Sequence, residues 1–514
     1  MADWLSRLRE RIAGKRGDVI VANVGAGARD VVVGKNIIKV GTLVVPATPV
    51  LIGVIVFIVL VALGAYVYFI PDKMPPVSFN VAVAEFGEIG MDGRVTVTEN
   101  SQMASRAIFT NLRDELAPLA PNLAAPLKPV VWHDSLFPTQ IRAHIPQIPG
   151  NTAQAQKDAA KNLATDLRAQ MIIYGNLKVN ETPATFVPEF FVAPLTNEAD
   201  EIVGQYQFGA PITIRLSVLP GSDLPTSLAL DQTFITRRKA LAQLTFGLMY
   251  DLHGDHEQAL ARFEEALKII QDSNAKTGED VLYYFLGREY LLLANKKQAE
   301  LETLDGQAKL QVTAQVEPLL AKAEEQFGNS LAKNKNYARA HAGVGSVARL
   351  RALRQSPQQR LEKPDFLNKA FAEYQTALSN AVQDREPMTQ SKMQISLGTT
   401  FFLQGEAFLF GFDWQKASGA FDESIRRTEQ QLDNLKDVPR SLGEAYLTLG
   451  NAYYDKGIAQ DQLGDKTASR DLFNTAIGYY DKCIALKKFD ETTALGAAAR
   501  CERYQAIVRE RAKQ

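Results

Sequence analysis

Cysteine is nearly absent from this sequence: its 514 residues include only Cys483 and Cys501, both near the carboxyl end. Two thiols exclude a small scaffold held by several disulfides, and they exclude a zinc site with four cysteine ligands. We expect the two cysteines on neighbouring helices. There, a disulfide and two separately buried side chains are both compatible with the sequence.

An excess of charge of either sign is also missing, because the formal net charge is −1. Proteins that bind nucleic acids usually carry a strong basic excess, so we expect no nucleic-acid partner. The hydrophobic share of 46% is that of an ordinary globular protein, and the length predicts several domains.

Catalytic motifs are lacking as well. The segment VGAGARDVVVGKN at 24–36 superficially matches a phosphate-binding loop. However, Arg29 stands where the first glycine is needed, and Asn36 stands where a hydroxyl would hold magnesium. Asp30 replaces the third glycine of a dinucleotide-binding fingerprint, and no G-x-S-x-G elbow occurs. We instead predict short strands at 19–24, 31–33 and 37–40.

Histidine is scarce, with five in the chain, and the densest polar group containing it is HGDHE at 253–257. Its possible metal ligands are His253, Asp255, His256 and Glu257. Their spacing differs from H-E-x-x-H, which places two histidines on one face of a helix. A Gly-Asp pair is typical of a turn that ends in a helix cap. We therefore predict no metal, no cofactor and no catalytic residue, and hence no enzyme.

One long uncharged run, VLIGVIVFIVLVALGAYVYFI at 50–70, is long enough to form a membrane-spanning helix. Basic side chains precede it, namely Arg7, Arg9, Arg11, Lys15, Arg16, Arg29, Lys35 and Lys39. Only Lys73 closely follows it. The distribution predicts a single-pass membrane protein in contact with the lipid bilayer. We expect a cytoplasmic basic arm with short β pieces over 1–42, a transmembrane helix over 43–70, and the bulk of the chain outside the cytoplasm.

Alternating strands and helices are expected over 75–235. Strands are predicted at 79–86, 129–134 and 171–179, helices at 103–116 and 153–169, and further extended stretches at 184–193 and 211–218. This order predicts β-α-β units on one sheet. Ligands in such sheets bind beyond the carboxyl ends of the strands, where Glu85, His133 and Asp134 fall. The alternative is that these side chains hydrogen-bond to loops and bind no ligand.

The same region resembles the amino-terminal α/β domains of TolB and of curli-type secretion lipoproteins. The resemblance is carried by VAVAEF, then by the helix MASRAIFTNLRDEL, then by LATDLRAQMIIYGNL. It also resembles an extracytoplasmic module that precedes helical repeats in some bacterial membrane proteins. These resemblances imply an envelope location and no enzyme activity.

The region 238–514 changes to helical periodicity with an internal repeat. The segment QLTFGLMYDLHGDHEQALARFEEAL at 243–267 places Gly247 and Tyr250 on a first helix. It places Ala259, Phe263 and Ala266 on a second. The pattern recurs as Gly287 and Tyr290 with Ala323 and Phe327, then Gly345 and Ala348 with Ala370, Tyr374 and Ala377, then Gly398 and Phe401 with Ala417 and Phe421, and finally Gly450 and Tyr453 with Ala476 and Tyr480. A last helix is expected over 491–512.

These pairs resemble tetratricopeptide (TPR) repeats, which implies stacked helix pairs that bind a protein partner on a concave surface. The predicted fold class is therefore α/β plus all-α. It combines a single transmembrane helix, a small α/β sandwich-like domain and a TPR-like α-solenoid. The expected function is a non-catalytic scaffold for protein–protein interaction at the membrane. The alternative is a sensor whose α/β module binds a small ligand or an envelope component outside the cytoplasm.

Overall fold

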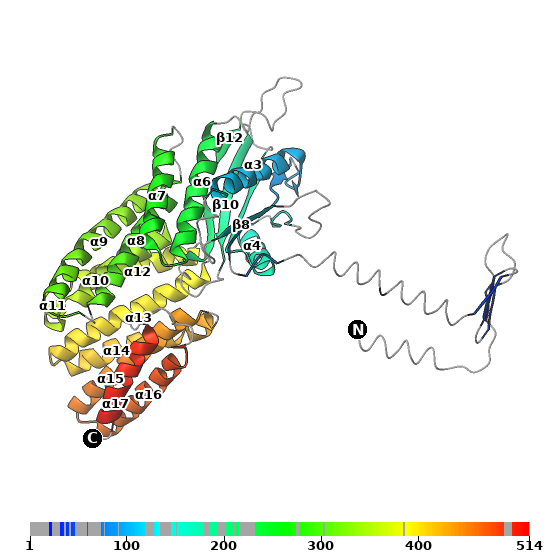
Figure 1. Cartoon of the computed structure of the whole chain (residues 1–514). Helices are drawn as coiled ribbons and strands as arrows, with labels where there is room; N and C mark the ends of the chain where they lie inside the picture. Colours follow the sequence, from blue (N-terminus) through cyan, green and yellow to red (C-terminus); the bar gives the residue numbers. More distant parts are fainter. Residues whose placement is uncertain are drawn as a thin grey trace. The chain divides into compact units, whose positions relative to one another are not determined.

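The computed structural model (Figure 1) contains a small antiparallel sheet, a mixed α/β sheet and a long array of helices. The residues that it describes are 20–22, 31–34, 37–40, 43–46, 59, 73–76, 78–90, 92–118, 128–133, 145–150, 152–178, 184–193, 202–209, 211–214, 232–273, 278–301, 304–383, 386–436, 438–487 and 496–512. Contacts divide the chain into two compact units. One comprises Met1–Asp72 with Phe137–Arg142, and the other comprises Lys73–Leu136 with Ala143–Gln514.

The first unit contains a four-stranded antiparallel sheet in the order β1-β2-β3-β4. Its strands are β1 (Ile20–Ala22), β2 (Val31–Gly34), β3 (Ile37–Val40) and β4 (Leu43–Pro46). Their valines and isoleucines favour extended backbone, and short polar or glycine-containing segments separate them. The first three strands coincide with the extended segments expected from the sequence.

The structure corrects the predicted membrane helix and the single-pass topology. Among the described helices, none combines the length and the apolar character that a bilayer span requires. The run at 50–70 lies outside the described residues except for Val59, and the expected start of the span at 43 belongs to strand β4. An apolar run shows only that a segment avoids water, whereas a span also needs a continuous helix. Long described helices such as α9 (Gly306–Lys333) expose charged side chains instead.

The mixed sheet of the second unit has the strand order β11-β10-β9-β5-β8. Its strands are β5 (Phe79–Val83), β8 (Pro129–His133), β9 (Met171–Lys178), β10 (Ala184–Val192) and β11 (Gly204–Gln207). Strand β5 runs parallel to β8 and β9, whereas β10 runs antiparallel to β9 and β11. The short strands β6 (Gly87–Ile89) and β12 (Ile212–Ile214) pair with one end of β9 and of β10, respectively, and β7 (Val95–Thr96) pairs with β6.

Helices cover both faces of this sheet because its strands are apolar on both sides. Val81 and Val83 pack in the same core as α3 (Glu99–Leu116) and α6 (Gln232–Asp251). The intervening Ala82 packs on the opposite face, in the core that contains α4 (Ala153–Leu167). Threonines cap the amino ends of both α3 and α4, which satisfies backbone N–H groups of the first turn.

The remaining helices form pairs that pack successively against one another, an arrangement compatible with a helical repeat solenoid. The pairs are α6 with α7 (His256–Gln271), α8 (Glu279–Glu300) with α9, α10 (Ala338–Arg354) with α12 (Asp365–Gln383), α13 (Pro387–Phe410) with α14 (Trp414–Glu429), and α15 (Pro439–Gln462) with α16 (Lys466–Ile484). A short helix α11 (Pro357–Glu362) interrupts the third pair, a 3-10 turn η3 (Leu432–Leu435) precedes the fifth, and α17 (Ala497–Arg511) packs on the fifth.

The sheet and the first helix pairs share one hydrophobic core. Buried side chains from β5, α6 and α8 belong to a single cluster that continues to Leu350 of α10. Helix α6 is buried along nearly its whole circumference, because it packs on the sheet, on α3 and on α7. In Figure 1, α6 correspondingly lies between the sheet and the rest of the array.

Candidate functional site

A glycine on the first helix of each pair lies against an aromatic ring of the second helix. A Cβ atom on the glycine would collide with that ring, so only glycine allows the close helix crossing. The contacts join Gly247 to Phe263, Gly287 to Phe327, Gly345 to Tyr374, Gly405 to Phe421, and Gly450 to Tyr480. The repeated contact explains why the pairs have similar packing despite different lengths.

The fourth pair differs in register from the sequence expectation, and the fifth pair has an additional glycine–aromatic contact. Gly405 contacts Phe421, whereas the expected Gly398 lies one heptad earlier and faces Thr428. In the fifth pair Gly457 faces Phe473, in addition to the expected contact of Gly450. Helix α13 carries two glycines at heptad spacing, Gly398 and Gly405, and the equally long α15 carries three, Gly443, Gly450 and Gly457.

The other predicted repeat residues line the same interfaces. The small residues Ala259, Ala266 and Ala417 are fully buried. The aromatic residues are also packed: Tyr250 is buried, the Tyr290 hydroxyl donates to Glu264, the Phe401 ring contacts Phe371, and the Tyr453 hydroxyl donates to Glu429. All of these residues therefore have packing partners within the array.

Two of the three strand-end residues proposed as ligand contacts lie among the described residues, and each has a partner within the chain. Glu85 accepts a hydrogen bond from Gln102 Nε2 of α3 at 2.9 Å. The buried His133 places Nδ1 2.9 Å from the carbonyl oxygen of Val83 on the neighbouring strand. Asp134 lies outside the described residues. This geometry matches the alternative in which strand-end polar groups satisfy local backbone and helix partners.

A buried carboxyl group lies elsewhere on the sheet, on the α4 face of β10. Glu189 is paired in register with Tyr174 of β9, and the Gln205 side chain of β11 hydrogen-bonds to it. Burial raises the pKa of Glu189 to about 7, although Gln205 and the charge of Lys178 favour the ionised form. Burial likewise raises the pKa of Tyr174. The sequence gives little sign of this group, because β10 is otherwise apolar.

The HGDHE segment forms a turn and contributes one member of a buried charged cluster. Asp255 caps α7 through the amide of Gln258. His253 Nδ1 lies 2.7 Å from the carbonyl oxygen of Met249, and Glu257 is exposed. Only His256 reaches inward, where its Nδ1 lies 2.8 Å from Glu289 Oε2.

Arg288 occupies the centre of that buried cluster. Its Nη1 lies 2.6 Å from Asp251 Oδ1 and 2.8 Å from Glu289 Oε1. Asp251, His256 and Glu289 lie close enough together to hold a metal ion. The guanidinium already provides positive charge to both carboxylates, and it would repel a cation beside them. The cluster therefore joins α6, α7 and α8 through charge–charge contacts, and the sequence could not show this because its members lie on different helices.

The sheet also covers the first helices of the second and third pairs. The Tyr206 ring of β11 lies 5.4 Å from the Phe285 ring of α8. The Arg339 guanidinium of α10 lies 4.3 Å from the centroid of the Tyr206 ring, and its Nη2 donates to the carbonyl oxygen of Val203. Burial is the largest influence on the pKa of Glu386 and would raise it, but Arg339, Thr389 and Lys157 together outweigh burial and lower it. This face of the first three pairs is therefore occupied by the chain itself.

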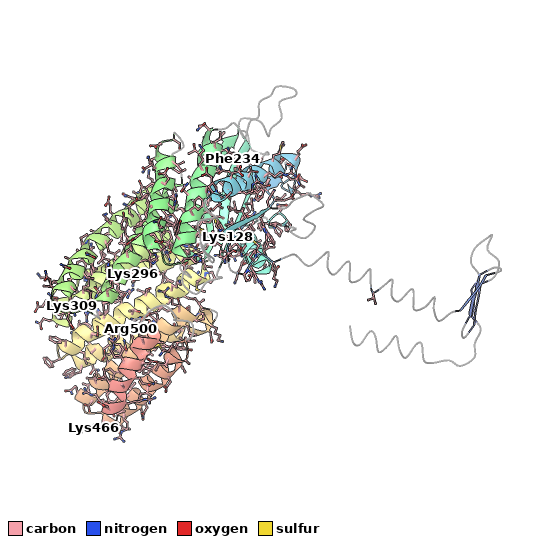
Figure 2. All side chains as sticks on the ribbon, in the orientation of Figure 1. Lys128, Phe234, Lys296, Lys309, Lys466 and Arg500 are labelled. Carbon is pink, nitrogen blue, oxygen red and sulfur yellow. A yellow bond between two sulfur atoms is a disulfide. The ribbon has the colours of Figure 1, made fainter. Side chains whose placement is uncertain are left out.

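The array is uncovered, in contrast, where the two helices of a pair connect. Exposed apolar side chains recur at these connections from the second pair to the fifth, and we name this surface the turn edge. It consists of Leu310, Leu353, Leu361, Phe410, Phe412 and Leu463. In Figure 2 the labels of Lys309 and Lys466, which lie at the starts of α9 and α16, mark the two ends of this edge.

Phe412 is the most exposed member of the turn edge, at 76%. Its φ of 59° lies in the left-handed region, where Gly254 and Gly464 lie in the first and fifth turns. A side chain in this conformation costs about 1–2 kcal/mol relative to the ordinary helical one. Among the described residues the Phe412 ring pairs with the ring of Trp414, and a Cβ on neighbouring Gly411 would touch Leu361. The turn edge is therefore continuous between the third and fourth pairs.

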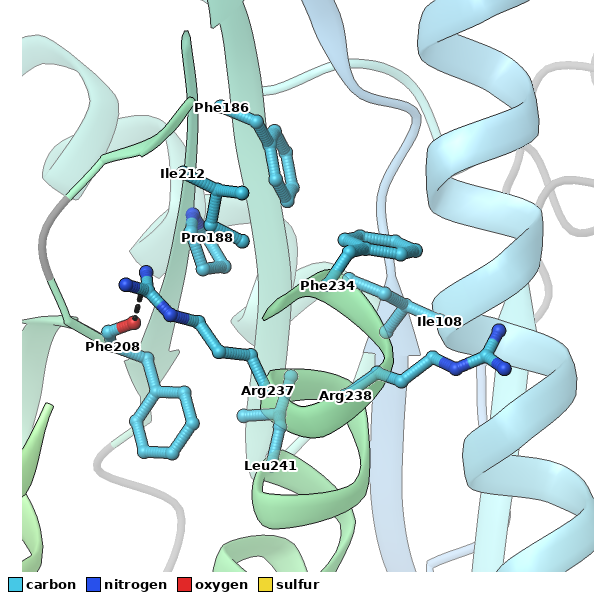
Figure 3. A pocket seen from close by; sticks show the side chains of 9 residues that line it. All are labelled: Ile108, Phe186, Pro188, Phe208, Ile212, Phe234, Arg237, Arg238 and Leu241. Carbon is cyan, nitrogen blue, oxygen red and sulfur yellow. Dashed lines mark hydrogen bonds between the residues drawn. The ribbon is translucent and has the colours of Figure 1, made fainter. Parts of the chain in front are cut away.

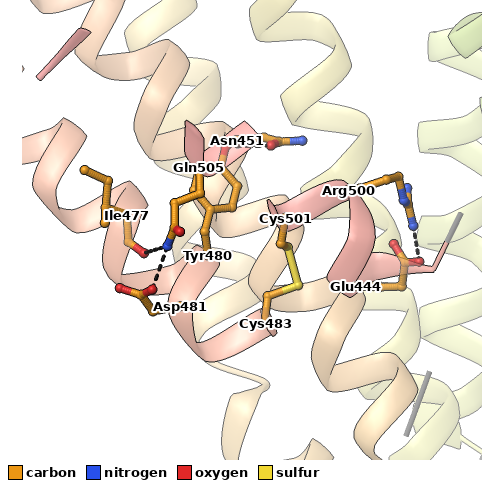
Figure 4. The surroundings of a disulfide bond; sticks show 9 residues. All are labelled: Glu444, Asn451, Ile477, Tyr480, Asp481, Cys483, Arg500, Cys501 and Gln505. Atoms are coloured by element: carbon orange, nitrogen blue, oxygen red, sulfur yellow. Dashed lines mark hydrogen bonds and ion pairs between the residues drawn. A yellow bond between two sulfur atoms is a disulfide. The ribbon is translucent and has the colours of Figure 1, made fainter. Parts of the chain in front are cut away.

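A disulfide between Cys483 of α16 and Cys501 of α17 closes the far end of the array (Figure 4). The sequence left this pairing open. Gln505 Nε2 donates to Asp481 Oδ1 at 2.6 Å, which adds a second link between these two helices. Arg500 also pairs with Glu444 of α15. Helix α17 is thus attached to both helices of the fifth pair.

No protein-family model matches this sequence, and no curated protein shows significant similarity to it. The packing and the exposed surfaces of the chain are therefore the features that indicate its function.

Proposed function

We propose that the helix pairs are TPR-like repeats and that their array binds a protein partner without catalysing a reaction. The recurring glycine–aromatic contacts support the repeat assignment, because small residues at the crossing are what the resemblance implies. Partner binding is the usual role of stacked helix pairs, which present an extended surface.

The turn edge is the proposed binding surface, in place of the face that the sheet covers. The observation that supports this assignment is the exposed ring of Phe412 on a left-handed backbone. A strained, exposed aromatic ring adds little to packing, and strain of this kind is typical of functional positions. Aromatic side chains also dominate binding energy at protein interfaces. The partner is a segment that presents a row of apolar side chains, such as one face of an amphipathic helix.

Site-specific photo-crosslinking tests this proposal. A photoreactive residue at Phe410, 51% exposed, should give a discrete crosslinked protein in cells that express the full chain. The matched control places the same residue at Val382, which is 56% exposed at the carboxyl end of α12. The Phe412→Asn variant should abolish the product from position 410. The same product from position 382, or a product that persists in Phe412→Asn, would contradict the assignment.

The same variant separates binding from folding. Asparagine tolerates the left-handed conformation, so relief of strain should offset the loss of the contact with Trp414. We expect the free energy of unfolding of Phe412→Asn to stay within about 1 kcal/mol of the parent protein. A denaturant titration measures this quantity, and a large loss would show that Phe412 serves folding.

A further inference from the structure

A surface groove lies between α3 of the α/β region and α6, the first helix of the array. Its volume is about 390 Å3, and its lining includes Met103, Arg106, Asn111 and Asp114 of α3 and Arg238 of α6. This volume falls in the range of small-molecule sites. The smaller apolar crevice on the other side of Arg238, shown in Figure 3, holds about 10 Å3 and is too small for a ligand.

Two guanidinium groups in the groove lack an ion-pair partner among the described residues. Figure 3 shows Arg238 projecting from α6 toward α3, whereas Arg237 points the opposite way and donates to the carbonyl oxygen of Phe208. Among the described lining residues Asp114 is the only carboxylate, and it already accepts hydrogen bonds from Nε and Nη2 of Arg113, at 3.1 and 3.0 Å. Arg106 and Arg238 therefore give the groove a local positive charge.

Two buried polar atoms of the groove also lack hydrogen-bond partners within the described chain. Arg238 Nε is a donor without an acceptor, and Asn111 Oδ1 is an acceptor without a donor. Buried polar atoms are normally hydrogen-bonded, so this pair provides sites for a ligand that carries both an acceptor and a donor. The exposed Met103 and the neighbouring Ala107 provide apolar contact for the body of such a ligand.

We propose that this groove binds a small organic anion. An oxyanion headgroup, phosphate or carboxylate, accepts hydrogen bonds from Arg106 and Arg238, and a hydroxyl of the ligand donates to Asn111 Oδ1. Arginine suits this role because its planar fork matches the geometry of both headgroups. This site goes beyond the proposed protein-binding role. It also differs from the predicted strand-end residues Glu85, His133 and Asp134.

Calorimetric titration of the full chain tests the site with three probes: inorganic phosphate, glycerol 3-phosphate and glutarate. Comparison of glycerol 3-phosphate with glutarate distinguishes a phosphate from a carboxylate headgroup. We expect one of these two organic anions to bind more tightly than inorganic phosphate. The affinity should fall as ionic strength rises, because the site is open to solvent.

Variants then assign the binding to the groove. Arg238→Gln and Arg106→Gln should each weaken binding about tenfold or more, the usual effect of losing a charged hydrogen bond. Arg238→Lys should bind at an intermediate level, because the charge remains but the fork is lost. The control is Arg94→Gln, which removes the same charge from an exposed position beside β7. Asn111→Leu should weaken glycerol 3-phosphate but not inorganic phosphate.

Two results would overturn the proposal. One is the absence of binding by all three probes at millimolar concentration. The other is equal binding by the parent protein and the variants at positions 106 and 238. If Arg238→Gln fails to fold, Arg238→Lys still tests the position, because lysine keeps the positive charge and removes only the guanidinium fork.

Discussion

The turns of the first and fourth helix pairs have the same left-handed backbone conformation, but the side chains at the two turns differ in exposure. In the first pair Gly254 occupies the left-handed position and the neighbouring Leu252 is buried. In the fourth pair Phe412 occupies that position and is exposed to solvent. The near end, α6 to α8, buries its surface against the chain's own sheet, whereas the far end, α13 to α17, keeps apolar side chains outside. Similar helix packing can therefore support an internal contact at one end and an external one at the other.

The strongest test of this contrast compares charged groups at the two ends. Arg288→Met at the near end leaves Asp251 and Glu289 buried without their cation. We expect a loss of about 3–5 kcal/mol in the free energy of unfolding, measured by denaturant titration. At the far end, Arg426→Met removes an exposed pair with Glu423 and should cost less than about 1 kcal/mol. Equal losses at the two positions would remove the distinction.

Reduction of the disulfide should affect the far end alone. The bridge closes a loop with a sequence separation of 18 between Cys483 and Cys501. Loss of a bridge of this size should cost about 3 kcal/mol of local stability by the chain-entropy argument. We expect amide exchange in α17 to accelerate in dithiothreitol and in the double variant Cys483→Ser/Cys501→Ser. Exchange in α6 should stay unchanged, and faster exchange there would indicate that the array unfolds as a single unit.

Glycine substitutions compare a position where a Cβ would collide with a neighbouring ring and a position where it would meet no other atom. Gly247→Val at the near end forces a side chain against the buried ring of Phe263, which should cost about 1–3 kcal/mol. At the far end, Gly419 of α14 has open space at its Cβ. Gly419→Ala should therefore stabilise the helix by up to about 1 kcal/mol. Thermal unfolding of both variants measures the difference, and destabilisation by Gly419→Ala would contradict this account of the packing.

The smallest effect concerns the sheet that covers the near end. The folded-state pKa of Glu189, about 7, lies above its ordinary value, so folding favours the protonated carboxyl. Stability from this group is complete at pH 4, falls as the pH rises toward 7, and stays low above it. Glu189→Gln should therefore raise the free energy of unfolding at pH 8 and leave it nearly unchanged at pH 4. Unfolding measured at both pH values would reveal the opposite sign if the carboxylate were stabilising.

The sequence predicts the first helix pair well because its turn has strong local chemistry. Gly254 and Asp255 fix the turn, and the spacing to Gly247 and Phe263 then follows. The extended segments at 79–86, 129–134 and 171–179 coincide with β5, β8 and β9, because their apolar runs leave little alternative. The membrane span predicted from the apolar run at 50–70 is wrong, because hydrophobicity alone does not distinguish a spanning helix from another apolar segment.

Other features depend on contacts that a single sequence does not display. The sequence places the fourth pair one heptad early because Phe412 stands where the first and fifth turns have a glycine, Gly254 and Gly464. Alignment of GFDW at 411–414 with HGDH at 253–256 and LGDK at 463–466 reveals that replacement. The cluster around Arg288 includes Asp251 and His256 from two other helices, and the groove places Arg106 of α3 near Arg238 of α6, so neither site has a local signal in the sequence.

The core shared by β5, α6 and α8 also has a consequence for how the chain folds during synthesis. Domains generally form in order as the chain leaves the ribosome, so the sheet is complete in sequence before α6 emerges. Helix α6 can then pack directly on the apolar face of the folded sheet, so the first helix pair does not require a second pair to stabilise it. Each later pair then packs on the one before it. A fragment that begins at α6 would lack the sheet, so its first helix pair would have no preformed apolar surface to pack on.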